Sequence, residues 1–281
     1  MPAKNIPPLV IPPRSGNHLQ SIILLHGRGS KGQKFGPELL ATHIPGFGLL
    51  QDVLPNAKLI LPTATKRRAR MYKRTPIHQW FDNWTLTTPT EREELQFEGL
   101  RDNAAIVHGL LREEIGAVGA RNVVLWGLSQ GCAMSLIATL LWEGTPFAAT
   151  IGMCGWLPLR QRMQDVLTTS ETTQHEDEDS TLRGRKPRLN GVVRYLREEL
   201  DMPPATGHPS VSALPMFLGH GIEDDRVSVS LAREAHGLLQ GLGLGVHYVE
   251  YPGLGHWYSG YMLRDIVLFI EREAGWRLGP S

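Results

Sequence analysis

Short apolar runs alternate along the chain with longer segments in which apolar residues recur every three or four positions. The short runs are rich in Val, Ile and Leu, as buried strands of a parallel sheet are, and they span residues 20–25, 57–61, 123–126, 147–153, 213–219 and 245–251. The longer segments have helical spacing, and they span residues 35–50 (interrupted by Pro45 and Gly46), 90–115, 132–142, 228–240 and 259–273. This alternation predicts a mostly parallel central sheet flanked by helices, a three-layer α/β/α fold.

Two segments depart from the alternation. Residues 1–17 are rich in proline and are expected to form an extended lead-in on the surface, before a single domain of residues 18–281. From about residue 160 to 212 the periodicity degrades into an acidic and then a basic stretch. We expect an insertion with a disordered or mobile centre and a short helix at 192–200.

Composition narrows the class of protein. Hydrophobic residues make up 41% of the chain and charged residues 20%, which is typical of a globular protein. A net charge of +1 is too balanced to favour nucleic acid or an anionic membrane as a partner. The two cysteines form no disulfide framework, residues 1–17 hold no apolar core of signal-peptide length, and no apolar run is long enough for a membrane span. A cytoplasmic location without stable membrane insertion is therefore expected, and the oligomeric state stays open.

The clearest chemical signal is Gly127-Leu-Ser129-Gln-Gly131, which joins a predicted strand directly to a predicted helix. Strand, Gly-x-Ser-x-Gly and helix in this order form a nucleophile elbow, in which a strained turn lifts the serine oxygen clear of the sheet. The turn also aims the Gln130 N–H at the point where an oxyanion could form. The alternative is that Ser129 only caps the helix and that the glycines are ordinary turn residues.

A glycine-rich loop, residues 26–32, follows the first strand. It lacks the Gly-Lys-Ser/Thr ending of a phosphate-binding P-loop, so nucleotide binding is disfavoured. In elbow-type hydrolases such a loop supplies the second oxyanion donor, and the Arg28 N–H is the expected group here.

A serine nucleophile needs a base and an acid that orients the base, and in elbow-type folds the chain order is Ser, acid, His. Asp224 follows the strand at 213–219, and His256 follows the strand at 245–251, which makes them the expected acid and base. The spacing Gly-x-x-Asp-x-x-Val favours Asp224 over its two neighbours. Glu223 and Asp225 are the rival acids. Among the other histidines, His220 precedes the acid and would break the order, His247 lies inside a strand, and His26 is expected to be structural in the glycine-rich loop.

The segment between the second and third strands carries two further features. The basic run 66–74 is expected to be a loop with a solvated surface, although phosphate binding is a second possibility. Thr90 and Glu93 have the spacing of a capping box that opens the next helix.

The chain resembles the acyl-protein thioesterase, lysophospholipase and carboxylesterase family of α/β-hydrolases. The matching motifs are His26-Gly27, Trp80-Phe81-Asp82, Gly127-Leu-Ser129-Gln-Gly131, Trp156-Leu157-Pro158-Leu159, His220-Gly221-x-x-Asp224 and Gly255-His256, spread over residues 20–272. The resemblance implies hydrolysis of acyl esters or thioesters by a serine triad, without metal or cofactor. It also implies that Trp80, Leu86, Trp156 and Leu157 lie near the substrate.

Three departures from the family pattern affect the choice of substrate. Cys132 stands where the family usually has a second glycine, and the basic run 66–74 and the insertion 160–212 are unlike compact members. The acyl acceptor, a small molecule or a lipidated protein, is therefore left open. The alternatives are a small-metabolite carboxylesterase, a lysophospholipase and a non-catalytic hydrolase-fold binding protein.

Overall fold

The computed structural model describes residues 6–172, 185–206 and 210–279. Across these ranges the chain forms a seven-stranded sheet in the order β1-β3-β2-β6-β7-β8-β9. Its parallel strands are β2 (Gln20–Leu25), β3 (Ala57–Leu61), β6 (Val123–Leu128), β7 (Ala149–Met153), β8 (Met216–Gly221) and β9 (Val246–Tyr251). They coincide with the six apolar runs of the sequence, so the predicted fold class is confirmed.

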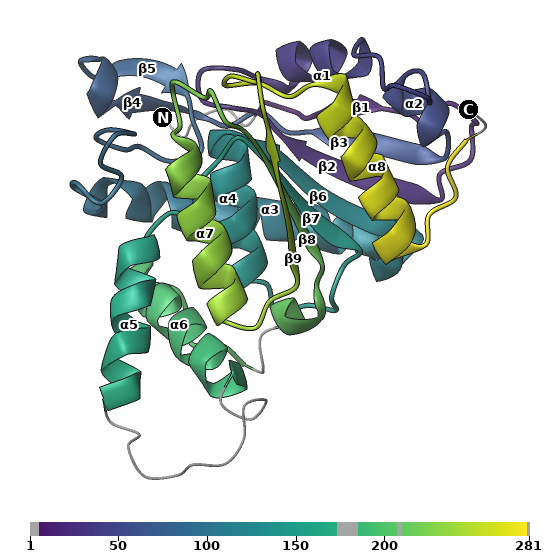
Figure 1. Cartoon of the computed structure of the whole chain (residues 1–281). Helices are drawn as coiled ribbons and strands as arrows, with labels where there is room; N and C mark the ends of the chain where they lie inside the picture. The colour runs from purple at the N-terminus through teal and green to yellow at the C-terminus, as the bar shows by residue number, and fades with distance from the viewer. Residues whose placement is uncertain (1–5, 173–184, 207–209, 280–281) are drawn as a thin grey trace.

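Helices cover both faces of this sheet (Figure 1). Alternate residues of β2 lie in two separate apolar clusters, Ile23 and Leu25 in one and Ile22 and Leu24 in the other. The first cluster is completed by α3 (Glu94–Val118), α4 (Gln130–Leu140) and α7 (Val229–Gly241). The second is completed by α1 (Gly32–Leu40), α2 (Leu50–Val53) and α8 (Gly260–Ala274). Short 3₁₀ turns lie at Ala120–Asn122 (η2) and Ser210–Ala213 (η3).

The proline-rich lead-in is extended at the surface over Leu9–Ile11, as expected, but these residues also belong to the sheet. They form β1, which pairs antiparallel with β3 at the edge of the sheet, with Leu9 opposite Leu61. An apolar Leu-Val-Ile triplet can complete a sheet edge even between prolines. Residues 1–5 lie outside the described residues.

The basic run 66–74 is part of a β-hairpin and not a loop. Strands β4 (Lys66–Ala69) and β5 (Thr75–His78) pair antiparallel, and the 3₁₀ turn η1 (Arg70–Tyr72) lies between them. The loop prediction is wrong because it rested on charge, whereas ladder hydrogen bonds and ion pairs to α3 hold these residues. Arg67, for example, forms ion pairs with two residues of α3, Asp102 at 2.7 Å and Glu98 at 3.4 Å.

The segment 160–212 contains two helices, α5 (Arg160–Thr172) and α6 (Arg185–Glu199), which project from the main body beside each other (Figure 1). Their contact surfaces bury Met163, Leu167, Leu189, Val192, Val193 and Leu196. The degraded periodicity therefore hid most of both helices, and only the helix expected at 192–200 was partly correct. The expected disordered or mobile centre falls on residues 173–184, outside the described residues.

The capping box expected at Thr90 does not form. Helix α3 begins at Glu94, and Glu93 precedes it with helical φ of −57° and no side-chain capping bond. The Glu93 carboxylate instead accepts a 2.8 Å hydrogen bond from Arg162 of α5. A contact between residues 69 positions apart thus replaces the local motif.

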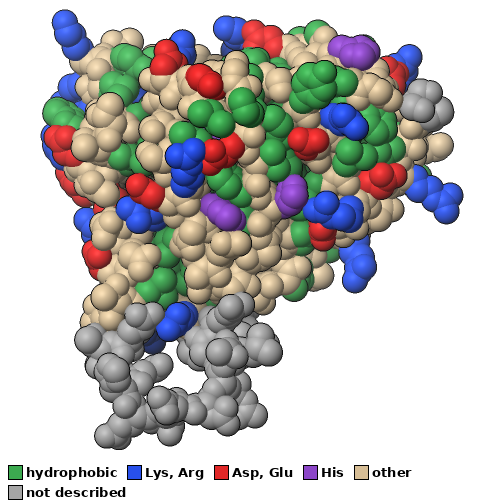
Figure 2. Space-filling view, in the orientation of Figure 1, with side chains coloured by type: hydrophobic (Ala, Val, Ile, Leu, Met, Phe, Trp, Pro, Cys, Tyr) green, Lys and Arg blue, Asp and Glu red, His purple; other side chains and the backbone are tan. Residues whose placement is uncertain are grey.

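Acidic and basic side chains are interspersed over the face shown in Figure 2, consistent with the balanced net charge. Within the described ranges, no helix combines the length and apolarity needed to cross a bilayer. Within the same ranges, no three His, Cys, Asp or Glu side chains gather as metal ligands would.

Candidate active site

Ser129 lies at the turn between β6 and α4, at the carboxyl end of a central strand. Its backbone has φ of 56° and ψ of −118°, a conformation that a residue with a side chain adopts only when its surroundings enforce it. The Ser129 N–H donates to Met153 O at 2.8 Å, which ties the turn to β7. The Ser129 side chain makes no capping hydrogen bond to α4, so the interpretation as a helix cap is wrong.

The two glycines of the motif allow strand and helix to approach closely. A Cβ on Gly127 would lie 2.2 Å from Gly131 O, and a Cβ on Gly131 would lie 2.1 Å from Leu25 O. Both distances are far below van der Waals contact, and the atoms met are backbone atoms that cannot swing away. Glycine at both positions is therefore required by the geometry of the turn.

The structure brings the three expected triad residues together. His256 Nε2 lies 2.9 Å from Ser129 Oγ, and His256 Nδ1 lies 2.7 Å from Asp224 Oδ2. The His256 ring faces a carboxylate on its Nδ1 side, so Nδ1 carries the proton and Nε2 is free to accept one from the serine hydroxyl. The His256 side chain is 12% exposed and that of Asp224 is 0% exposed. The arrangement is a hydroxyl, an imidazole and a buried carboxylate in a line.

Asp224 is held by four donors. Its Oδ1 accepts the backbone N–H groups of Arg226 and Val227 at 2.9 and 2.8 Å, and Oδ2 accepts from His256 and from His220 Nε2 at 3.1 Å. Burial alone would raise the pKa of Asp224, but the hydrogen bonds from His220, His256 and Val227 outweigh burial and hold the pKa well below its usual value. The carboxylate therefore remains ionised at neutral pH.

His220 is the site residue whose role the sequence did not indicate. It is 1% exposed, and its Nε2 faces both Asp224 and the backbone oxygen of Val227, at 2.8 Å. Since both neighbours are acceptors, Nε2 carries a proton and donates it. The sequence shows that His220 precedes Asp224 by four residues. That order excluded His220 as the base but gave no sign that it contacts the acid.

The glycine-rich loop lies against the serine on its other side. A Cβ on Gly27 would lie 3.4 Å from Ser129 Cβ, so the next residue, Arg28, begins within reach of the nucleophile. Among the described residues, no acceptor takes the N–H of Arg28 or that of Gln130, the first residue of α4. Two such N–H groups flanking a serine are the donors that an oxyanion requires.

His26 anchors this loop and is not a base. Its Nε2 accepts the Ala64 N–H at 3.0 Å, and its Nδ1 lies 2.7 Å from Gly27 O. Burial lowers the pKa of His26 to about 4, so the ring is neutral at physiological pH. The expectation that His26 is structural fits this geometry.

Trp80 belongs to the support of the site and not to its surface. The indole is 1% exposed and donates from Nε1 to His26 O at 2.8 Å, while the Trp80 backbone N–H donates to Gln130 Oε1 at 3.0 Å. These bonds join the glycine-rich loop to the start of α4. The buried indole therefore positions the site from behind, and its expected contact with the substrate stays a prediction.

Of the other three residues expected near the substrate, Trp156 and Leu157 are also buried, at 2% and 4% exposure, and Leu86 is partly buried. Trp156 and Leu157 line a cavity of about 40 Å³ between α7 and the start of α3, and Leu86 is partly buried against the same apolar cluster. Trp156 also packs edge-on against Phe81, whose carbonyl accepts from Gln130 Nε2 at 2.7 Å.

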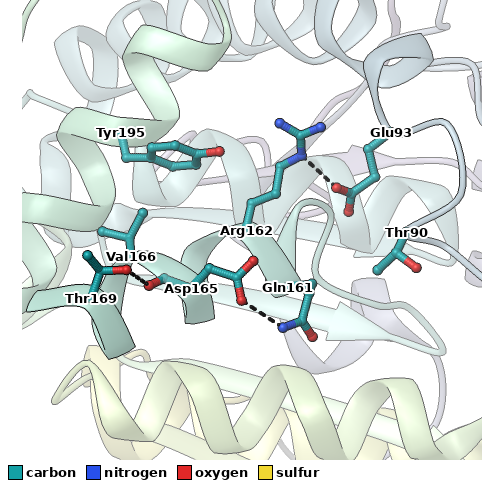
Figure 3. A pocket seen from close by; sticks show the side chains of 8 residues that line it. All are labelled: Thr90, Glu93, Gln161, Arg162, Asp165, Val166, Thr169 and Tyr195. Atoms are coloured by element: carbon teal, nitrogen blue, oxygen red, sulfur yellow. Dashed lines mark hydrogen bonds and ion pairs between the residues drawn. The ribbon is translucent and has the colours of Figure 1, made fainter. Parts of the chain in front are cut away.

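A larger cavity of about 660 Å³ adjoins the small one, since the two share Thr90, Glu93 and Gln161. Figure 3 shows Arg162 of α5 directed at Glu93, with Tyr195 of α6 above it. Burial raises the pKa of Glu93 despite its bond to Arg162. None of the three triad residues lines this cavity, so it is separate from the nucleophile.

Comparisons with known proteins agree with this geometry. A family model described as phospholipase/carboxylesterase matches residues 7–185. The acyl-protein thioesterase 1 of Gibberella zeae is 24% identical over 277 residues, covering 97% of this chain and 98% of the relative. That of Yarrowia lipolytica is 28% identical over 269 residues, covering 95% and 97%.

Solved structures share the fold. The crystal structure of Zea mays acyl-protein thioesterase 2 is similar with a TM-score of 0.67 and 22% identity, over 95% of this chain and 99% of that one. Arabidopsis thaliana SOBER1 is similar with a TM-score of 0.65 and 20% identity, over 90% and 98%.

Proposed function

The chain belongs to the phospholipase/carboxylesterase family, and from this membership we propose that it hydrolyses carboxylic esters or thioesters through an acyl-enzyme on Ser129. The family makes it a hydrolase with ester substrates. The observation that carries the finer proposal is the pair of contacts at His256, 2.9 Å to Ser129 Oγ and 2.7 Å to Asp224 Oδ2.

In the first half-reaction, Ser129 Oγ attacks the acyl carbonyl while His256 Nε2 accepts the hydroxyl proton. The negative charge that develops on the carbonyl oxygen is stabilised by the N–H groups of Arg28 and Gln130. Asp224 stays ionised and stabilises the imidazolium. His256 then protonates the departing alcohol or thiol as its bond to carbon breaks, leaving the acyl group on Ser129.

In the second half-reaction, water attacks the acyl-enzyme, and His256 accepts its proton before returning one to Ser129 Oγ. The carboxylic acid leaves and the site is restored. Trp156, Leu157 and Leu86 would contact the acyl group or the acceptor, since the first two line a small cavity and Leu86 packs against the same apolar cluster.

Ser129→Ala tests the proposal. Kcat for p-nitrophenyl butyrate should fall by about 10⁶-fold, by analogy with other serine triads, and a fluorophosphonate probe should label wild type only. Ser135→Ala is the matched control, because Ser135 is a buried serine of α4 whose hydroxyl bonds only Gly131 O. Near-normal hydrolysis by Ser129→Ala would overturn the assignment. Wild type that is neither labelled nor active would favour a hydrolase-fold binding protein.

The acyl acceptor separates the enzyme alternatives. Identities of 24% and 28% to acyl-protein thioesterases support a thioester as one substrate class without fixing it. Rates on short-chain esters, long-chain esters, lysophospholipids and an S-palmitoyl peptide would distinguish them. A sharp preference for short chains would favour a small-metabolite carboxylesterase over depalmitoylation.

A further inference from the structure

The Arg28 backbone begins beside the nucleophile, and its side chain is held against the basic hairpin. Its backbone follows Gly27, which lies against Ser129, and its guanidinium reaches under the turn η1 of the basic hairpin. There Nη1 lies 3.1 Å from Met71 Sδ, and Cζ lies 5.9 Å from the centre of the Tyr72 ring. The sulfur and the ring hold the cation in one place without neutralising it.

The charge on Arg28 has no counter-ion in the described part of the chain. A thioether is a weak acceptor, and the guanidinium has five N–H donors to satisfy. Burial lowers the pKa of Arg28, although Tyr72 and Asp82 act against this, and an arginine stays charged in any case. Among the described residues Asp82 forms no ion pair with Arg28; its oxygens accept the backbone N–H groups of Arg70 at 3.1 and 3.3 Å and of Asn83 at 3.1 Å, and Oδ2 lies 4.0 Å from Arg70 Nε.

Arg67 on the same hairpin shows the contrasting case. Its guanidinium contacts Asp102 at 2.7 Å, as expected for a cation that serves only to hold the hairpin on α3. Arg28 is therefore a partly buried cation whose donors remain available. A desolvated cation without a partner is costly, and a bound anion would offset that cost.

The surroundings also favour an anion. Residues 66–74 contain six cations and no carboxylate; Arg67 is paired with Asp102 and Glu98, and Arg70 lies 4.0 Å from Asp82. The hairpin is tied to the glycine-rich loop by the 2.7 Å bond from Gly29 N–H to His78 O. Positive charge gathered at the mouth of a site raises the local concentration of anionic substrates.

We propose that the Arg28 guanidinium is an anion-binding subsite beside Ser129, and that the preferred substrate is an ester or thioester carrying a carboxylate or phosphate near the scissile carbonyl. This rests on the proposed function, because the subsite is defined relative to the nucleophile. Arg28 thus has two separate parts, a backbone N–H that faces the oxyanion and a side chain that selects the substrate.

The test compares kcat/KM for matched neutral and anionic esters in each variant. On the acyl side, mono-p-nitrophenyl glutarate is compared with p-nitrophenyl valerate, and on the acceptor side 4-acetoxybenzoate with phenyl acetate. In wild type, at least one anionic ester of a pair should be preferred. Arg28→Gln should lower that anionic-to-neutral ratio by about 10- to 100-fold, the effect of losing a charge-assisted hydrogen bond. Arg28→Lys should restore part of it.

Arg68→Gln is the control, because it removes an exposed cation of the same hairpin. It should change the ratio by less than about twofold. An unchanged anionic-to-neutral ratio in Arg28→Gln would overturn the proposal. An equal fall of the ratio in Arg68→Gln would also overturn it, because the preference would then come from the overall positive charge of the hairpin and not from Arg28. A purely structural Arg28 would lower both rates together and leave the ratio unchanged. Wild type inactive on all four esters would instead count against the proposed function.

Discussion

Replacing Asp224 by Asn removes one negative charge from the proposed triad while changing almost no volume. In wild type, Oδ1 accepts two backbone N–H groups and Oδ2 accepts from His256 and His220. The amide oxygen of Asn can keep the two backbone bonds, and its NH₂ group must then face the two histidine rings. His256 Nδ1 can no longer donate there.

The consequence is a change of tautomer. With Nδ1 turned into an acceptor, the proton of His256 moves to Nε2, which faces Ser129 Oγ at 2.9 Å and then cannot take the serine proton. The same substitution in serine proteases lowers kcat by about 10⁴-fold, equivalent to about 5 kcal/mol of transition-state stabilisation. We expect a loss of this order in kcat for p-nitrophenyl butyrate, with KM changed little.

Asp225→Asn provides the matched control, since Asp225 is the exposed neighbour of Asp224 and removes the same charge from the same loop. It should retain wild-type kcat. Retention of more than about a tenth of wild-type kcat by Asp224→Asn would refute the assignment, as would an equal loss in Asp225→Asn. Circular dichroism and thermal melting of both variants would show whether the fold is intact.

Two further predictions concern stability. Gly131→Ala should lower the free energy of unfolding by about 3 kcal/mol or more, because its Cβ would lie 2.1 Å from Leu25 O. Gly116→Ala, on the exposed face of α3 with nothing within 4 Å of the added Cβ, should raise it by about 1 kcal/mol. Equal denaturation midpoints for the two variants would contradict this prediction. Acid should also destabilise the protein through Asp224, whose pKa in the folded state lies below the ordinary value of 3.8. The stability that Asp224 contributes is therefore complete above that pH and is lost as the pH falls further. In urea melts between about pH 6 and pH 2, the free energy of unfolding should fall less steeply for Asp224→Asn than for Asp225→Asn.

The sequence by itself determined the sheet and the place of the nucleophile. Strands β2, β3, β6, β7 and β8 are buried almost throughout, so each reads as an apolar run that local pattern identifies, whereas the edge strand β9 is only partly buried. The elbow is equally local: the steric demands at Gly127 and Gly131 come from atoms within a few residues or from the adjacent strand. Chain order alone then pointed to Asp224 and His256, which the structure places within hydrogen-bonding distance of each other.

Only the tertiary structure decided the features that depend on partners far along the chain. The basic hairpin is stabilised by pairing of Lys66 with His78 and by ion pairs to α3, and Glu93 bonds Arg162 in preference to capping its own helix. The burial of Trp80, the hydrogen bond from His220 to Asp224 and the contact of Arg28 with Met71 are likewise set by long-range packing. Hydrophobic periodicity in the sequence shows which face of a helix or strand is buried. The partner of a buried polar side chain is fixed only when distant segments meet, because a hydrogen bond or ion pair to that partner offsets the cost of desolvating the side chain.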